Sequence, residues 1–268
     1  MNPAPFGAPF PVTMRHPPRT WLTRLSAHIR DALMAWSPLY LRTRTGFLVR
    51  ISRRTEARIY ERMFVEDMFP LAAIQWRELP QRPVVFDVGA CFGYFALSAM
   101  DRHPDAQVHL FEANPHLLPV IEHHRDINGC ANWTINHGAV GDSSQPIELH
   151  LSSTPLVASL NAAKAHAHHA KGTVRVPGIR LDDYVAAKSI ARIAIMKLDV
   201  EGCEEHIIRH SPATFDRVEA LFIRLFHGFS ELSRVQELLR HHNLRLAAAA
   251  VHHHNEYLFL RSSESRID

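Results

Sequence analysis

The chain has 268 residues, of which 46% are apolar and 21% are charged, and this is enough to bury one substantial core of the α/β size class. No apolar run reaches the roughly 20 residues of a membrane-spanning helix, so the composition excludes a helical integral membrane protein. Cys91, Cys130 and Cys203 are too isolated for a disulfide framework or a four-cysteine metal site, so we expect a soluble protein in a reducing compartment, the cytoplasm.

The formal net charge of +3 is concentrated at the start of the chain, where residues 1–62 hold eleven arginines against three acids. Six prolines among the first eighteen residues predict a polyproline-like tail. Between Trp21 and Trp36 the apolar residues fall on one face of a basic helix. Such a helix is typical of a cap docked on a domain, of a segment that contacts a membrane surface or an anionic substrate, or of an organelle presequence. We therefore divide the chain into a basic, Pro/Arg-rich extension, residues 1–46, and a folded domain, residues 47–268.

From residue 47 onward, predicted strands and helices alternate. Strands are predicted over residues 47–51, 83–88, 107–112, 133–140, 146–151, 173–176, 192–199, 218–226, 244–251 and 257–260, and helices over residues 53–69, 92–100, 114–128 and 230–241. Asn114 and Pro115 are typical of an N-cap and a first helical position. The alternation predicts an α/β fold: a doubly wound, mostly parallel seven-stranded sheet that ends in a C-terminal antiparallel hairpin.

The first parallel strand runs into Asp87, Gly89 and, four residues later, Gly93. Glycines let backbone approach a ligand closely, but this spacing is not the G-x-G-x-x-G of a dinucleotide site. An acid before the first glycine suits a cationic or hydroxyl-bearing ligand better than a phosphate. Glu112, at the end of the next strand, is placed to accept hydrogen bonds from a ribose diol, and Asp142, after the third strand, to accept one from a purine amine. Together these residues predict an S-adenosylmethionine site.

Four blocks occur in order along the chain: FDVGACFGYF at residues 86–95, LFEANP at 110–115, LDDY at 181–184 and IMKLDVEGCE at 195–204. They resemble the D-V-G-A-N-x-G-x-F, A-F-E-P-N-P, L-D-D and I-K-I-D-V-E-G-x-E blocks of the FkbM family of class I S-adenosylmethionine-dependent methyltransferases. The resemblance covers about residues 60–230. It implies a Rossmann-like fold and S-adenosyl-L-methionine as the cofactor.

The resemblance also implies roles for particular residues. The methionine part of the cofactor would be surrounded by Asp87, Gly89, Ala90 and Gly93, the ribose would meet Glu112, and the adenine side would meet Asn114 and Asp142. The plainer alternatives are a tight turn for the glycines, helix capping for Asn114 and turn formation for Asp142. Two positions depart from the family pattern: Cys91 stands where the family has an asparagine, and Arg224 stands where it tends to carry an acid.

The predicted catalytic residues lie around strand 192–199. Methyl transfer from a sulfonium is an in-line displacement, so the enzyme must align the acceptor and, for a hydroxyl, help to remove its proton. Asp199 or His227 could accept that proton, with Glu201 and Lys197 nearby. The alternatives are a helix-dipole interaction for Glu201 and Glu204, and an ion pair with a neighbouring acid for Lys197. Asp199, Glu201 and a histidine would also suit magnesium, but the spacing does not require it, and we assign no metal ligand.

The many histidines, such as His123 and His124, have no zinc-like pairing with cysteines, so we expect most of them at the surface. The sequence predicts O-methylation of a hydroxyl on a sugar, glycolipid or other secondary metabolite, with peripheral membrane contact through the basic start and no nucleic-acid partner. Two alternatives stay open. Cys91 and Arg224 favour a non-catalytic cofactor-binding or scaffold module, and the arginine-rich start would suit a nucleic-acid methyltransferase, although the chain lacks an N-P-P-Y-like block after strand 192–199.

Overall fold

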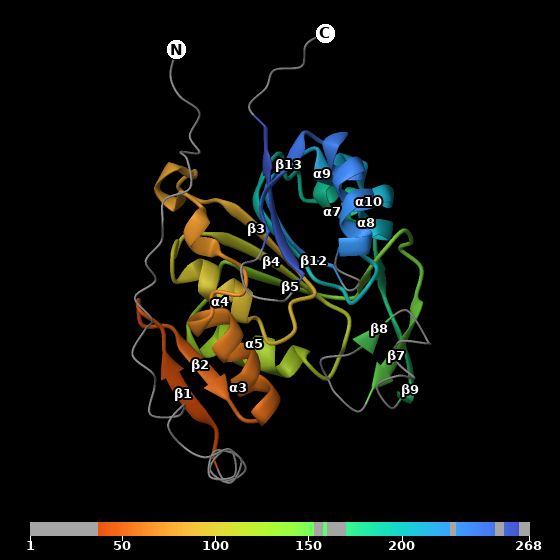
Figure 1. The fold of residues 1–268 in the computed structure, drawn as a ribbon. Coiled ribbons are helices and arrows are strands. Elements are labelled where there is room, and N and C mark those ends of the chain that lie inside the picture. Colours follow the sequence, from red (N-terminus) through yellow and green to blue (C-terminus); the bar gives the residue numbers. More distant parts are fainter. Residues whose placement is uncertain (1–36, 153–157, 160–169, 226–228, 250–254, 263–268) are drawn as a thin grey trace.

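A seven-stranded sheet forms the centre of the protein in a computed structural model (Figure 1), which describes residues 37–152, 158–159, 170–225, 229–249 and 255–262. Its strand order is β13-β14-β12-β11-β3-β4-β5. The strands are β3 (Val84–Val88), β4 (Gln107–Glu112), β5 (Trp133–His137), β11 (Ile193–Leu198), β12 (Val218–Arg224), β13 (Leu244–Ala249) and β14 (Glu256–Arg261). β14 pairs antiparallel with both β12 and β13, while the pairs from β12 to β5 are parallel. The predicted fold class and the terminal hairpin are confirmed.

Helices cover both faces of this sheet (Figure 1). One layer holds α3 (Arg54–Tyr60), α4 (Tyr94–Met100) and α5 (Leu118–Ile127), and the other holds α7 (Leu181–Ala187), α8 (Glu204–His210), α9 (Pro212–Phe215) and α10 (Phe229–Arg240). Successive side chains of a strand point to opposite faces, so β12 sends Phe222 into the first core and Leu221 and Ile223 into the second. A sheet covered on both faces explains why its strands are almost continuously apolar.

Smaller sheets flank the central one. β1 (Leu39–Arg42) and β2 (Leu48–Ile51) form an antiparallel pair, so this hairpin straddles the predicted division between residues 46 and 47. β7 (Ile147–Ser152) pairs antiparallel with β8 (Ala158–Ser159) and β9 (Ala170–Val176), and β6 (Ala139–Val140) pairs parallel with β10 (Gly178–Ile179). Short helical turns, η2 (Leu71–Ala73) and η3 (Trp76–Glu78), precede β3.

Three predicted elements differ from the structure. The helix predicted over residues 53–69 is α3 followed by a π-helical turn, η1 (Glu61–Val65), and ends there. The strand predicted over residues 133–140 breaks at Gly138, where a Cβ atom would lie 2.7 Å from the carbonyl oxygen of Pro177. The helix predicted from Asn114 begins one turn later, at Leu118, because Asn114 instead closes a turn by accepting a hydrogen bond from the His116 amide.

The expected surface position is wrong for His124, which is completely buried. Its Nε2 accepts from the backbone amide of Arg50 and its Nδ1 donates to the carbonyl of Phe92, so both ring nitrogens hold neighbouring segments together. Burial lowers the pKa of His124 to about 4. The predicted basic helix between residues 21 and 36 lies outside the described residues, as does His227. Within the described ranges, every helix is too short or too polar to cross a bilayer.

Candidate functional site

A cavity of about 380 Å³ opens at the carboxyl ends of β3, β4, β11 and β12. The chain leaves β3 toward β4 and β5 on one side and later adds β11 and β12 on the other, so the cavity lies where the strand order reverses. In open α/β sheets this switch point is the usual ligand site, and the volume is in the range of small-molecule pockets. The wall includes the turn after β3, the end of β4 and the loop after β11.

The turn after β3 is held to the end of β4 by backbone hydrogen bonds and lies against the loop after β11. The amides of Gly89 and Ala90 both donate to the carbonyl of Phe111, at 3.0 and 2.9 Å. Gly89 has a φ of +78°, and a Cβ atom there would lie 2.0 Å from the carbonyl oxygen of Asp199, so glycine is required by both conformation and space. Gly89 and Ala90 line the cavity. Gly93, in contrast, packs against the ring of Trp133 and lies behind the turn.

Glu112 presents a fixed carboxylate to the cavity. Its Oε2 accepts a hydrogen bond from the Cys91 amide at 2.7 Å, and its Oε1 accepts one from the Asn114 amide at 2.8 Å. Burial raises the pKa of Glu112 to about 7, although these two donors oppose the shift. Asn114 is buried behind this wall and does not line the cavity. Glu112 therefore places a fixed carboxylate in the cavity wall at the end of β4.

Asp87 and Lys197 form a buried pair between β3 and β11. The Lys197 ammonium lies 3.0 Å from Oδ1 of Asp87 and also donates to the carbonyl of Gly89, so the ion pair predicted as the alternative for Lys197 is confirmed. Burial pulls the pKa of Lys197 down, but the carboxylates of Asp87 and Asp199 pull it up further, and the net shift is upward. Lys197 lines the cavity, whereas Asp87 lies behind it. In this arrangement Asp87 holds the turn through Lys197.

Asp199 and Glu201 share one cation, Arg224. The Arg224 Nε donates to Oδ1 of Asp199 at 2.8 Å, and the same guanidinium contacts Glu201. Burial alone would raise the pKa of Asp199, but the charges of Arg224 and Lys197 outweigh it and lower that pKa. Asp199 is therefore an ionised carboxylate at neutral pH. Glu204 is engaged locally, since it accepts from the amides of Val200 and Gly202 and orders the loop before α8.

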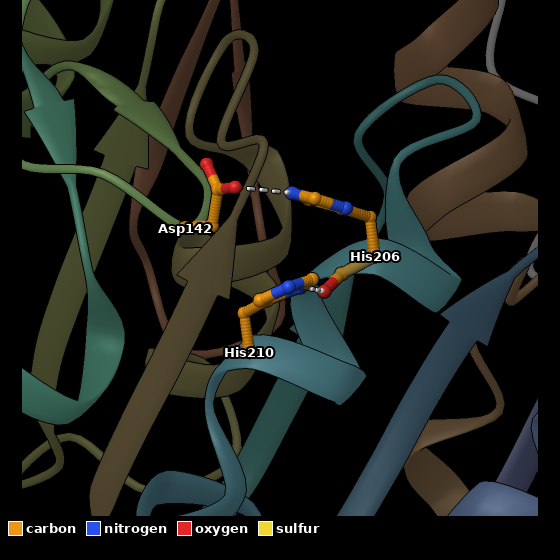
Figure 2. Close-up of side chains that lie close together, drawn as sticks. All are labelled: Asp142, His206 and His210. Carbon is orange, nitrogen blue, oxygen red and sulfur yellow. Dashed lines mark hydrogen bonds and ion pairs between the residues drawn. The ribbon is translucent and has the colours of Figure 1, made fainter.

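Asp142 does not line the cavity. Its side chain is 49% exposed, and its Oδ2 lies 3.4 Å from Nε2 of His206 on α8 (Figure 2). Val140, two residues earlier, does line the cavity, so the predicted position is close in the chain while the side chain points elsewhere. Of the predicted residues, the structure brings together Gly89, Ala90, Glu112, Lys197, Asp199 and Glu201 in the cavity wall.

Sequence reasoning missed the contribution of α3 and η1. Arg58 of α3 and Arg62 and Met63 of η1 line the cavity, and so does Phe69, in the segment after η1. Arg62 forms an ion pair at 2.9 Å with Glu256 of β14, and this pair belongs to the same charged region as Arg224. The available signal was the four-residue spacing of Arg58 and Arg62, which places two cations on one helical face.

Comparison with known proteins identifies the family of the chain. Residues 87–259 match the model of the methyltransferase FkbM domain, which is more than half of the chain. The chain belongs to the FkbM methyltransferase family. It is thus an S-adenosylmethionine-dependent methyltransferase by family, as the four sequence blocks predict. The 31-O-demethyl-FK506 methyltransferase FkbM of Streptomyces tacrolimicus is 26% identical to it over 197 residues, which cover 64% of this chain and 76% of that protein.

Solved structures with related folds are more distant. A methyltransferase FkbM from Methylobacillus flagellatus KT is 13% identical with a TM-score of 0.48, and the match covers 67% of this chain but only 44% of that one. The precorrin-6y C5,15-methyltransferase of Geobacter metallireducens GS-15 is also 13% identical, with a TM-score of 0.44 over 83% of this chain and 94% of that chain.

The cofactor that the family implies fits the groups in the cavity wall. Glu112 offers carboxylate oxygens suited to hydroxyl donors, and the Gly89–Ala90 turn offers backbone without a bulky side chain. Leu117 and Val140 supply apolar surface of the kind that covers an aromatic base. Asp199 and Glu201 add two carboxylates to the wall, and both contact the Arg224 guanidinium.

Proposed function

We propose that this FkbM-family protein transfers a methyl group from S-adenosylmethionine to a hydroxyl oxygen of a sugar, glycolipid or other small secondary metabolite. When bound, the cofactor supplies a methyl group on a positively charged sulfur. The observation that carries the proposal is the ionised Asp199 carboxylate in the wall of the cavity. Support for oxygen as the acceptor atom comes from the relative in Streptomyces tacrolimicus, which is named as a 31-O-demethyl-FK506 methyltransferase.

Asp199 can take part in proton removal while it stays paired with Arg224. Among the described residues, the contacts from Arg224 reach a single oxygen of this carboxylate, Oδ1. The second oxygen, Oδ2, is then the atom that can accept a hydrogen bond from an acceptor hydroxyl. Only 14% of the Asp199 side chain is exposed, so little water competes for that position. Arg224 also keeps the carboxylate ionised, which a proton acceptor requires.

The sheet order separates two ends of the cavity. Glu112 ends β4, whereas Arg224 ends β12, and β3 and β11 lie between these strands. Three strand spacings correspond to about 14 Å, which is enough to place a ribose at one end and an acceptor at the other. The β12 end carries Asp199, Glu201 and the two arginines Arg62 and Arg224. Such a polar lining supports an acceptor that carries several hydroxyls.

A pair of matched variants tests this proposal. Asp199→Asn keeps the shape of the side chain but removes its charge, so we expect binding of S-adenosylmethionine within a few-fold of wild type and turnover reduced about 100-fold or more. Asp105→Asn, at an exposed site far from the cavity, is the control and should change neither quantity. Calorimetry measures binding, and release of S-adenosylhomocysteine over a panel of sugars and glycolipids measures turnover. Wild-type turnover by Asp199→Asn would refute the assignment of this carboxylate.

The pairing of Arg224 with both acids favours one alternative, a cofactor-binding module without catalysis. Under that alternative, wild-type protein would bind S-adenosylmethionine but release no S-adenosylhomocysteine with any acceptor class. A nucleic-acid acceptor is the other alternative. We expect no methyl transfer to RNA or DNA, and steep salt dependence of nucleic-acid binding would support that alternative instead.

A further inference from the structure

Three metal-ligating side chains meet outside the cavity (Figure 2). His206 and His210 lie on α8, and Asp142 follows β6. One ligand atom from each of the three lies within 4.8 Å of the other two. Two histidines four residues apart project from the same face of a helix, which is the spacing of histidine pairs that bind zinc. Neither the cofactor nor the acceptor site described above uses these side chains.

A hydrogen bond to the backbone of α8 determines which nitrogen of His210 is available to a metal. His210 Nδ1 lies 2.8 Å from the carbonyl oxygen of His206. A carbonyl only accepts, so Nδ1 carries the hydrogen and Nε2 keeps its lone pair for a metal. A metal-binding histidine typically donates its other ring N–H to a carbonyl or carboxylate in this way, which fixes the ring. The backbone of α8 therefore fixes the tautomer of His210 in which Nε2 is the nitrogen that can bind a metal.

The separation of His206 and Asp142 is close to that of neighbouring ligands in a tetrahedral site. Nε2 of His206 and Oδ2 of Asp142 are 3.4 Å apart. In tetrahedral zinc, with ligand distances of about 2.0 to 2.1 Å, neighbouring ligand atoms are separated by roughly 3.3 Å. The pair already has this separation, and the two imidazole centroids are 4.2 Å apart. A small rotation of His210 would complete the three-ligand arrangement, and its exposed position permits that movement.

We propose that Asp142, His206 and His210 bind a divalent transition metal, with zinc as the first choice, and leave a fourth position for water. Two imidazoles and one carboxylate suit zinc, cobalt or nickel better than magnesium or calcium, which prefer oxygen ligands throughout. Nearby charge does not oppose this site, because Arg209 is paired with Glu205 at 2.8 Å. This site is separate from any magnesium position at Asp199 and Glu201, where a cation would have to displace Arg224.

The site would tie together two parts of the cavity wall. Asp142 follows Val140, and α8 begins directly after Cys203, and both of these residues line the cavity. A bound metal would therefore cross-link the β6 side to the α8 side at the surface. We expect zinc to stabilise the folded protein by mass action and to be released by chelators.

The test uses the full chain without an affinity tag of histidines, stripped of metal with a chelator. Because the chain holds 20 histidines, total zinc uptake is not the readout. The readouts are the affinity of the tightest zinc site by calorimetry and the visible absorption of tetrahedral cobalt. His206→Gln and Asp142→Asn should each weaken that site by at least about tenfold and remove the cobalt band, given the losses seen even for outer-shell changes. The control His241→Gln replaces another exposed histidine and should leave both unchanged.

Each outcome decides the proposal. Loss of the tight site in His206→Gln and Asp142→Asn, with retention in His241→Gln, supports it. Equal zinc affinity in wild type and both site variants overturns it, as does a tight site with wild-type cobalt absorption in Asp142→Asn. Circular dichroism of the variants confirms that they fold, which the exposure of all three side chains leads us to expect. No step of this test depends on methyl transfer, so it stands or falls separately from the proposed function.

Discussion

Removing the Lys197 ammonium should destabilise the protein strongly and do so through Asp87. The side chains of Asp87 and Lys197 are 0% and 5% exposed, and their charged atoms lie 3.0 Å apart. In Lys197→Met the Asp87 carboxylate would remain buried without its cation. Breaking a buried pair in this way costs about 3 to 5 kcal/mol of unfolding free energy, a large share of the about 5 to 15 kcal/mol that a domain possesses.

The double substitution Asp87→Asn, Lys197→Met separates this charge effect from a simple packing effect. With both charges absent, we expect about 1 to 3 kcal/mol of the loss to be recovered relative to the sum of the two single variants. Urea unfolding followed by fluorescence and circular dichroism measures each variant. Lys188→Met, at an exposed position, is the control for the chemical change and should lie within about 0.5 kcal/mol of wild type. The reasoning would be refuted if the loss of unfolding free energy in the double variant equalled the sum of the losses in the two single variants. It would also be refuted if Lys197→Met lost no more unfolding free energy than Lys188→Met.

Three further predictions concern residues that line the cavity: Gly89, Cys91 and Glu112. Gly89→Ala should cost at least about 2 kcal/mol and abolish calorimetrically detectable cofactor binding, because its Cβ would overlap the Asp199 carbonyl at 2.0 Å in a left-handed conformation. Cys91→Asn should raise the unfolding free energy by up to about 1 kcal/mol in urea titrations, because Cys91 has a φ of +55°, which asparagine tolerates better. The raised pKa of Glu112, about 7, predicts opposite pH trends for folding and for binding. Without cofactor, the contribution of Glu112 to the unfolding free energy is fully present below its unfolded pKa of about 4.5 and is lost as pH rises through 7. The affinity for S-adenosylmethionine should instead increase about tenfold from pH 6 to pH 8, because the Glu112 carboxylate ionises over that range. Glu112→Gln should remove both trends, and an unchanged pH profile in this variant would assign them to another group.

The central sheet was predictable because its signals are local. Each parallel strand is a short apolar run that ends near an acid or glycine, and the two-residue period of side chains needs no distant information. The break at Gly138 was not predictable, because it depends on the carbonyl of Pro177, which is far away in the sequence. The π-helical turn η1 has the same apolar spacing as an α-helix over so few residues, so periodicity predicted one continuous helix.

The candidate site was predictable by position and less so by side-chain direction. The end of a strand fixes where Cα atoms such as those of Glu112 and Asp142 lie, but packing with other segments decides where the side chains point. Glu112 points into the cavity because two backbone amides hold it, whereas Asp142 turns toward His206. The spacing of His206 and His210 was visible in the sequence. Its partner Asp142 was not, since only folding brings the turn after β6 beside α8.

Arg224 alters how the acids of the cavity can act without making them unusable. An arginine that held both oxygens of Asp199 would block proton acceptance, but among the described residues the contacts from Arg224 converge on Oδ1. The same contact lowers the pKa of Asp199, which makes it a weaker base than a carboxylate in an apolar pocket. In-line methyl transfer from a sulfonium requires mainly that the acceptor is aligned with the methyl group. The hydroxyl proton need only leave as the bond between the oxygen and the methyl carbon forms. A weak, rigidly held carboxylate is compatible with those demands, so the contact with Arg224 agrees with the role proposed for Asp199 and does not by itself mark an inactive protein.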